Sequence, residues 1–272
     1  MNKILNRTTF PSFKDAIKKE YLITNRMGGY ASSTIVDCHS RKHHGLLVVP
    51  LKKYLKSYNL LSKFDVSLIY NKIDIPLSTN KFSGVYAPKG YNYIRSFEME
   101  LYPITKFCIG NIEITRSLIM PSNTNSILIR YDVLKADRKI KIKGIPFLAY
   151  RDIHSTMKEN MDIRQRTYFE KNGFKIDPYH GMPALYMQTS SKSDFYPSPE
   201  WWKNFEFLEE KERGYDYQED LFSPGIFEAI LKQDESFIIR ASIDKPSICI
   251  NEEWEAEVIR TLDRTCNHNF FQ

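Results

Sequence analysis

Residues 103–134 read PITKFCIGNIEITRSLIMPSNTNSILIRYDVL, and this stretch decides the fold class. Apolar and polar residues alternate in 112–120 and again in 126–134, which is the period of a half-buried strand. Gly110-Asn111 is a two-residue hairpin signal, and the turn-forming PSNTN cluster separates the two alternating segments. The stretch therefore predicts consecutive antiparallel strands.

The same kind of pattern continues on the C-terminal side. KIKIKGIPFL (139–148) alternates, and GIFEAILKQDESFIIRASI (225–243) predicts a further hairpin with residues 232–235 at its tip. Helical periodicity is scarce before the C-terminus, and the linkers are too short for the crossovers of a parallel sheet. The sequence predicts a mainly β fold, a large antiparallel β-sandwich of the supersandwich type, formed as one domain by residues 1–248.

Two segments depart from the strand pattern. Residues 191–225 are rich in charged and aromatic residues and contain three prolines, so we expect an ordered excursion with a short helix. Residues 249–272 predict an amphipathic helix, with Asn251 as its N-cap and acidic residues in its first turn. The apolar residues expected to share the buried face of this helix are Trp254, Val258, Ile259 and Leu262.

The composition is that of a globular protein without a strongly charged partner. The 39 basic and 33 acidic residues give a formal charge of +6, and the basic residues lie in short clusters, so we expect no nucleic-acid partner. No apolar run approaches the ~20 residues of a membrane span, and the N-terminus lacks the apolar core of a secretory signal. We therefore expect a soluble cytoplasmic protein with no membrane partner. The scattered cysteines are expected as reduced thiols: Cys38, Cys108, Cys249 and Cys266.

The stretch TNRMGGYASSTIVDCHSRKHHGLLV (24–48) places glycines, hydroxyl residues and histidines between apolar segments. A zinc site built on Cys38 and the nearby histidines is disfavoured because the flanks have strand character, and four extended residues span roughly 12 Å. The stretch also lacks the GK[ST] ending of a phosphate loop and the pattern of a nucleophile elbow. We therefore predict no metal, no cofactor and no catalytic nucleophile here.

A crowded acidic segment, residues 209–220, follows Trp201-Trp202. Glycosidases use a pair of carboxylates on either side of the scissile bond, and this segment could supply them. A solvated acidic surface paired with Lys211 and Arg213 fits the spacing equally well. The residues alone leave both interpretations open.

Four motifs occur in order along the chain: TNRMGGYASST, SRKHHGLLV, YRDIH (150–154) and WWKNFEF…EKERGYDYQEDLFSPG. Together they resemble the N-terminal domain of bacterial and archaeal-type glycogen debranching enzymes, from about Tyr21 to Gly225. The sequence departs from the family pattern at two positions. Arg26 stands where a glycine is usual, and His43 stands where a tyrosine is usual.

The resemblance implies a two-part enzyme, an amylo-α-1,6-glucosidase. A β-sandwich is followed by a helical (α/α)6 barrel that hydrolyses α-1,6-linked glucose at glycogen branch points with its own two carboxylates. Such a barrel needs several hundred residues. Residues 249–272 are therefore expected to be a linker toward a catalytic domain that lies outside this chain, in cis or in trans, and the chain alone is not expected to catalyse hydrolysis.

The resemblance also gives the polar stretch a role. Gly28-Gly29 lets the backbone turn sharply, so that the polar ribbon can face the mouth of the barrel. We expect contact with an α-glucan, glycogen or starch-like, or with the partner domain. The candidate residues are Asn25, Gly28, Gly29, Arg41, His44, Arg151, Asp152, His154, Glu210, Arg213 and Asp216.

Two other functions stay open. In one, the chain is a free-standing, non-catalytic α-glucan-binding or assembly protein. Alternatively, the acidic segment 209–220 makes the chain a glycosidase by itself. Release of glucose from a branched dextrin separates the last of these from the others.

Overall fold

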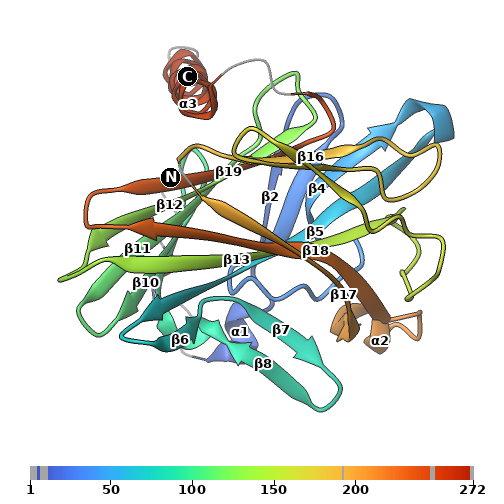
Figure 1. The fold of residues 1–272 in the computed structure, drawn as a ribbon, viewed down its shortest axis with the longest axis horizontal. Coiled ribbons are helices and arrows are strands. Elements are labelled where there is room, and N and C mark those ends of the chain that lie inside the picture. The colour runs from blue at the N-terminus through green and yellow to red at the C-terminus, as the bar shows by residue number, and fades with distance from the viewer. Residues whose placement is uncertain (1–4, 7–11, 192, 246–248, 270–272) are drawn as a thin grey trace.

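The computed structural model describes residues 5–6, 12–191, 193–245 and 249–269, and it describes side chains in 12–191, 193–245 and 249–264. Two large antiparallel sheets face each other across one apolar core, and a C-terminal helix lies outside them (Figure 1). The expected mainly β sandwich is confirmed.

The first sheet has nine strands and contains the segments with the clearest alternation. Its order is β1-β9-β10-β11-β12-β19-β16-β15-β14. The predicted turn at Gly110-Asn111 joins β10 to β11, and Gly110 takes a positive φ of 56°, as a two-residue hairpin turn requires. The strands are β1 (Leu5–Asn6), β9 (Ile94–Met99), β10 (Pro103–Ile109), β11 (Ile112–Ile119), β12 (Ser126–Lys135), β14 (Thr167–Glu170), β15 (Gly173–Ile176), β16 (Leu185–Thr189) and β19 (Ser236–Ser242).

The second sheet has eight strands, in the order β17-β18-β13-β5-β4-β3-β2, with β6 paired to β5. It places the polar stretch 24–48 at one edge, because β2 is the last strand. The strands are β2 (Glu20–Thr24), β3 (Tyr30–Thr34), β4 (Gly45–Leu51), β5 (Lys56–Tyr70), β6 (Ile73–Pro76), β13 (Ile140–Asp152), β17 (Asp194–Glu206) and β18 (Gln218–Leu231).

The remaining elements are short, apart from the last helix. A two-stranded ribbon is formed by β7 (Thr79–Phe82) and β8 (Val85–Lys89). The helices are α1 (Phe13–Ala16), α2 (Leu208–Glu212) and α3 (Ile250–Asn269), with 3₁₀ helices η1 (Lys52–Tyr54) and η2 (Gly90–Tyr93).

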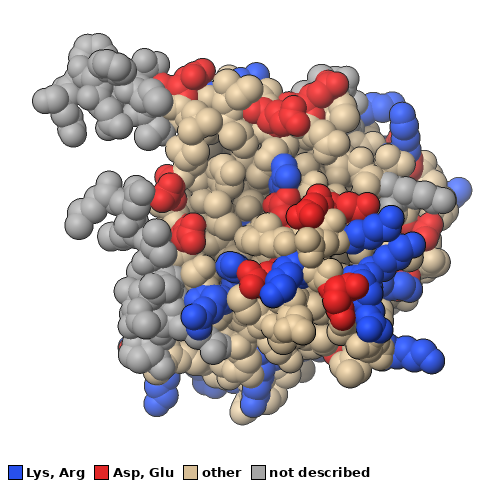
Figure 2. All heavy atoms as spheres, turned by 90° about the vertical axis from the view of Figure 1, so that its left-hand side faces the viewer, with Lys and Arg blue, Asp and Glu red and all other residues tan. Residues whose placement is uncertain are grey.

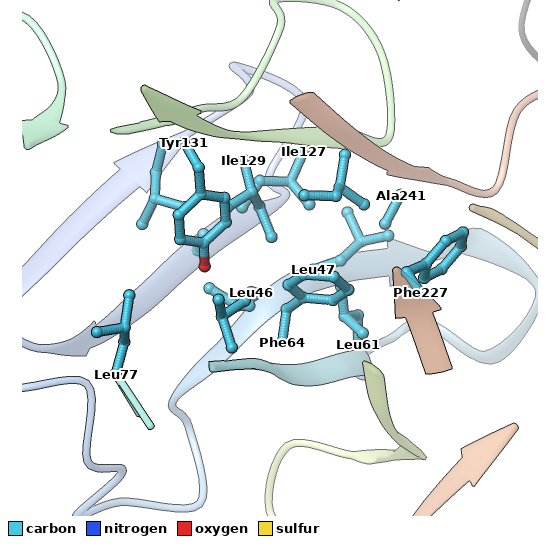
Figure 3. Close-up of a cluster of buried hydrophobic side chains, with 14 of the residues drawn as sticks. Leu46, Leu47, Leu61, Phe64, Leu77, Ile127, Ile129, Tyr131, Phe227 and Ala241 are labelled. Atoms are coloured by element: carbon cyan, nitrogen blue, oxygen red, sulfur yellow. The ribbon is translucent and has the colours of Figure 1, made fainter. Parts of the chain in front are cut away.

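The core lies between the two sheets. Tyr131 and Ile129 of β12 point toward Leu47 of β4 and Phe64 of β5 (Figure 3). The ring of Phe227 of β18 lies tilted beside that of Phe64, with ring centroids 6.3 Å apart. Burying an apolar side chain of this size contributes about 1.5–3 kcal/mol, so this core is the main source of stability.

The predicted hairpin over residues 225–243 is wrong. β18 pairs with β17 and β13 in the second sheet, whereas β19 pairs with β12 and β16 in the first. In the turn between them, Asp234 N–H donates to Val133 C=O and Val133 N–H donates to Glu235 C=O. These bonds attach the turn to β12, so the chain leaves the second sheet after β18 and enters the first sheet at β19.

The excursion expected over residues 191–225 is mostly strand. Its short helix is present as α2, but β17 and the first part of β18 account for most of the rest. Proline is tolerated because β17 is an edge strand, where one side of the backbone needs no ladder hydrogen bond.

The C-terminal helix begins at Ile250, so Asn251 lies in its first turn and is not its N-cap. The helix covers the outer face of the first sheet, where Ile250 and Trp254 pack on a separate apolar cluster. The predicted apolar face is only partly right, because Ile259 and Leu262 are exposed while two acids turn inward. These acids are Glu253, 2.8 Å from Arg240 Nε, and Glu257, which accepts from the Ser122 hydroxyl and N–H.

The surface carries mixed charge. On the face in Figure 2, Lys and Arg side chains are interspersed with Asp and Glu. None of the helices in the described ranges is long and apolar enough to cross a membrane.

Candidate functional site

The turn between β2 and β3 is built around Asn25. Its side-chain Oδ1 accepts hydrogen bonds from the N–H groups of Met27 and Gly29, each at 2.9 Å. Gly28 has a φ of +84°, and a Cβ on Gly29 would lie 2.6 Å from Asn25 Nδ2. Gly28 is therefore favoured by its left-handed backbone, and Gly29 by its close approach to the Asn25 side chain. Asn25 itself is fully buried, so it shapes the turn from inside.

The segment between β3 and β4 folds into tight turns rather than an extended chain. Thr34 Oγ1 accepts from Cys38 N–H and donates to Cys38 C=O, and Ser40 N–H donates to His44 Nδ1 at 3.2 Å. The rings of His39 and His44 approach within 5.5 Å. Among the residues that the structure describes, no three His, Cys, Asp or Glu side chains form a group that could hold a metal ion.

These two turns meet at an open pocket of about 380 Å³. The outward-facing residues of β2 and β3 form its floor, since alternate residues of a strand share a face. The turn glycines form one end, and the residues before β4 form the other. The lining residues are Glu20, Leu22, Thr24, Gly28, Gly29, Tyr30, Ser32, Arg41, His43 and His44.

A charged group stands at the wall of the pocket. Arg41 Nε donates to Glu20 Oε1 at 2.8 Å, and Arg41 also lies 3.4 Å from Glu209. His44 accepts at Nδ1, which leaves its proton on Nε2, and Nε2 lies 3.5 Å from Glu20 Oε1. His44 first, and Arg41 after it, lower the pKa of Glu20 to about 2. Glu20 is therefore ionised at neutral pH.

His43 lies at the mouth of the pocket. Tyr30 donates its hydroxyl proton to the His43 carbonyl at 3.0 Å. The His43 ring meets the His154 ring edge to face, with centroids 5.3 Å apart. Burial lowers the pKa of His43, so the ring is neutral at pH 7.

Three of the expected residues lie at the end of β13 or just after it. Arg151 is buried and pairs with Glu219 of β18. Asp152 lies 2.8 Å from Lys56 Nζ and accepts from the N–H of His154. None of the three lines the pocket, but the His154 ring contacts His43, and Arg151 donates to the backbone C=O of Lys42.

The expected residues of α2 and the following turn divide into two kinds. Glu210 is 2% exposed, and its carboxylate accepts from the N–H of Lys42 at 3.3 Å. Arg213 and Asp216 are exposed and do not line the pocket. The motif that contains all three therefore does not bring them to one place.

The buried carboxylates of the acidic region are all engaged. Glu210 accepts from the N–H of Lys42, Glu219 pairs with Arg151, and Asp220 accepts from two backbone N–H groups. Glycoside hydrolysis needs two carboxylates that face a shared substrate site. These contacts give the region a structural role.

The sequence analysis did not select Glu20, Tyr30 or His43 as candidates. The sequence does contain a signal for Glu20 and Tyr30. Residues 20–24 and 30–34 flank the double glycine as two strands, and alternate residues of a strand lie on the same face. His43 stands in the sequence both among the histidines of the disfavoured zinc site and as a departure from a motif.

One known protein family matches most of this chain. A family model described as glycogen debranching enzyme N terminal matches residues 19–238, which include every lining residue of the pocket. A search of curated proteins gives no match.

Several solved structures match this chain at low sequence identity and low TM-score. A 4-alpha-glucanotransferase from Thermococcus litoralis is 13% identical, with a TM-score of 0.43, over 90% of this chain and 40% of that one. A bacterial glucoamylase complexed with acarbose is 7% identical, with a TM-score of 0.38, over 90% and 33%. Heparan sulfate lyase HepC from Pedobacter heparinus is 13% identical, with a TM-score of 0.36, over 70% and 24%. This chain thus spans less than half the length of each of them.

Proposed function

We propose, because the chain belongs to the glycogen debranching enzyme N-terminal family, that it is the non-catalytic part of an amylo-α-1,6-glucosidase. In this proposal it supports hydrolysis of α-1,6 branch points in glycogen by a helical (α/α)6 domain, supplied in cis or in trans. Glycogen is a cytoplasmic polymer, so we also propose a cytoplasmic location.

One observation carries the proposal. Residues from the first two family motifs, separated by more than ten positions, line one open pocket inside the matched region: Gly28 and Gly29 from the first, Arg41 and His44 from the second. That two turns with unusual sequence requirements meet at one pocket supports a binding site rather than packing alone.

The chemistry of the pocket suits a neutral sugar. Arg41 supplies N–H donors and the ionised Glu20 supplies acceptors, which together can bind adjacent hydroxyl groups of a glucose unit. The half-exposed side chain of Leu22 offers an apolar surface for the C–H face of the ring. The opposite charges lie close together, so the pocket does not favour a strongly charged ligand.

The same pocket could also receive the catalytic domain. It lies next to the edge strand β2, and the expected partner residues Arg41 and His44 line it. A loop of a helical domain that binds here would place the pocket beside that domain's own substrate site. We propose that the pocket contributes to both contacts.

A free-standing α-glucan-binding protein is the second candidate. The observation that favours it is that donors, acceptors and the apolar side chain of Leu22 all line one open pocket within residues 20–44. Such a pocket can bind a glucan chain without a catalytic partner.

Affinity electrophoresis in gels that contain glycogen tests the proposal. We expect the chain to be retarded by glycogen, and Arg41→Met to weaken the retardation. Arg138→Met is the matched control, because Arg138 is an exposed arginine on a remote loop. Equal mobility with and without glycogen, for wild type and both variants, removes glucan binding from the proposal.

A second assay separates the two candidates. Glucose release from a branched limit dextrin is measured for this chain alone, for a helical debranching domain alone, and for the mixture. The proposal expects no release by the chain alone and a higher rate for the mixture than for the helical domain. A mixture no faster than the helical domain supports the free-standing binder, and release by this chain alone refutes the non-catalytic role.

A further inference from the structure

The backbone of Lys42 is held on both sides by buried charged side chains. Its N–H donates to Glu210 Oε1 at 3.3 Å, and its C=O accepts from Arg151 Nη2 at 2.9 Å. Glu210 is 2% exposed and Arg151 is 3% exposed. Lys42 lies between Arg41 and His43, which both line the pocket.

These two contacts fix two different peptide planes. The Lys42 N–H belongs to the peptide unit that begins at the Cα of Arg41, and the Lys42 C=O belongs to the unit that ends at the Cα of His43. Each unit is rigid because of its partial double bond. Holding both units therefore restricts the directions in which the Arg41 and His43 side chains leave the backbone.

The arginine of this clamp is itself rigid. Arg151 Nε and Nη2 both donate to the carboxylate of Glu219, which is fully buried, and Nη1 donates to the Asp152 carbonyl at 3.2 Å. The guanidinium also lies over the ring of Phe207. Glu219 in turn accepts from the N–H of Met157 at 3.0 Å. Charge-assisted bonds of this kind are stronger than neutral ones, particularly where water is excluded.

We propose that Glu210 and Arg151 are positioning residues of the pocket, which preorganise Arg41 and His43 for an α-glucan by clamping the Lys42 backbone. The inference rests on the proposed function for the identity of the ligand. It assigns to these two residues a role different from direct contact with sugar, since neither lines the pocket.

The clamp also has an electrostatic signature. Burial is the main influence on the pKa of His43 and lowers it. The charge of Glu210 raises this pKa, and the charges of His154, Lys42 and Arg151 lower it. Loss of the Glu210 charge should therefore lower the pKa of His43, whereas a general loosening of the fold would expose the ring and raise it.

Three substitutions in α2 test the clamp. Glu210→Ala removes the acceptor, Glu210→Gln keeps an acceptor oxygen but removes the charge, and Glu212→Gln changes an exposed carboxylate of the same helix as the control. Amide hydrogen exchange at Lys42, NMR titration of His43 and binding of maltoheptaose are measured for each variant.

We expect Glu210→Ala to accelerate exchange at Lys42 and to weaken maltoheptaose binding about tenfold, the equivalent of one lost charge-assisted bond. Glu210→Gln should recover most of the affinity while lowering the pKa of His43. Glu212→Gln should match wild type in all three measurements. If Glu210→Ala does not fold, Glu210→Gln still tests the inference through His43.

Two outcomes overturn the inference. One is unchanged Lys42 exchange and unchanged His43 titration in both Glu210 variants. The other is wild-type maltoheptaose affinity in a Glu210→Ala protein whose Lys42 exchange is accelerated. If wild type binds no maltoheptaose but the exchange and titration effects appear, the clamp stands and the glucan assignment fails.

Discussion

Replacing Arg151 with methionine measures how much the buried Arg151–Glu219 ion pair matters for the free energy of unfolding. In the folded protein Arg151 makes two hydrogen bonds to Glu219 and one to the carbonyl of Lys42. Methionine fills part of the same volume but leaves the Glu219 carboxylate buried, with the N–H of Met157 as its remaining protein partner in the described chain.

The size of the effect follows from this arrangement. Removing one partner of a buried ion pair costs about 3–5 kcal/mol, because the other charge stays buried without compensation. A domain of this kind has a total stability of about 5–15 kcal/mol. We therefore expect Arg151→Met to lower the free energy of unfolding by about 3–5 kcal/mol, a large fraction of the total.

Urea denaturation at pH 7.5, followed by tryptophan fluorescence, measures the change. The control is Arg138→Met, which breaks a surface contact of 3.8 Å between half-exposed side chains and should cost less than about 1 kcal/mol. The double variant Arg151→Met, Glu219→Gln should recover most of the loss, since no uncompensated charge remains. Equal costs for Arg151→Met and Arg138→Met, or no recovery in the double variant, would refute the reasoning.

Three further predictions concern the turn, the pocket charge and the helix. Gly29→Ala should cost about 1–3 kcal/mol in urea denaturation, because the new Cβ would lie 2.6 Å from Asn25 Nδ2; a wild-type midpoint contradicts the turn geometry. Glu20→Gln should cost about 1 kcal/mol at pH 7, discounted for partial exposure. Since the neighbouring His44 holds the pKa of Glu20 near 2 against 4.5 in the unfolded chain, this cost should shrink as pH falls from 4.5 toward 2, and a cost independent of pH contradicts it. Trp254→Ala should release α3 from the sheet and speed trypsin cleavage within it, whereas unchanged cleavage means that the helix is held by other contacts.

Much of the fold could be predicted from local pattern. Period-two alternation in 112–120 and 126–134 identified β11 and β12, and Gly110-Asn111 identified the turn between β10 and β11. The pairing of 225–243 could not be predicted in this way. A turn that joins neighbouring strands and a turn that crosses between sheets have similar local sequences, and bonds to Val133, a distant residue, decide between them.

The helix and the site show the same limit. The amphipathic pattern predicted that Ile259 is buried. In the structure Ile259 is exposed and Glu253 is buried, where it pairs with Arg240. Arg240 lies in β19, outside the helix, so the helical pattern alone could not reveal this pair. The polar stretch 24–48 does form a pocket wall. Glu20 could not be predicted as a site residue because an acidic residue on an edge strand is common. Only the folded chain brings it against Arg41.

The central claim is that the pocket between the two turns binds an α-glucan. Titration of ¹⁵N-labelled protein with maltoheptaose, followed by amide chemical shifts, tests this claim most directly. The account predicts saturable shifts concentrated in residues 20–34 and 41–44, which are absent in Arg41→Met. Saturable shifts that map to another face, or no shifts at millimolar sugar, would contradict it.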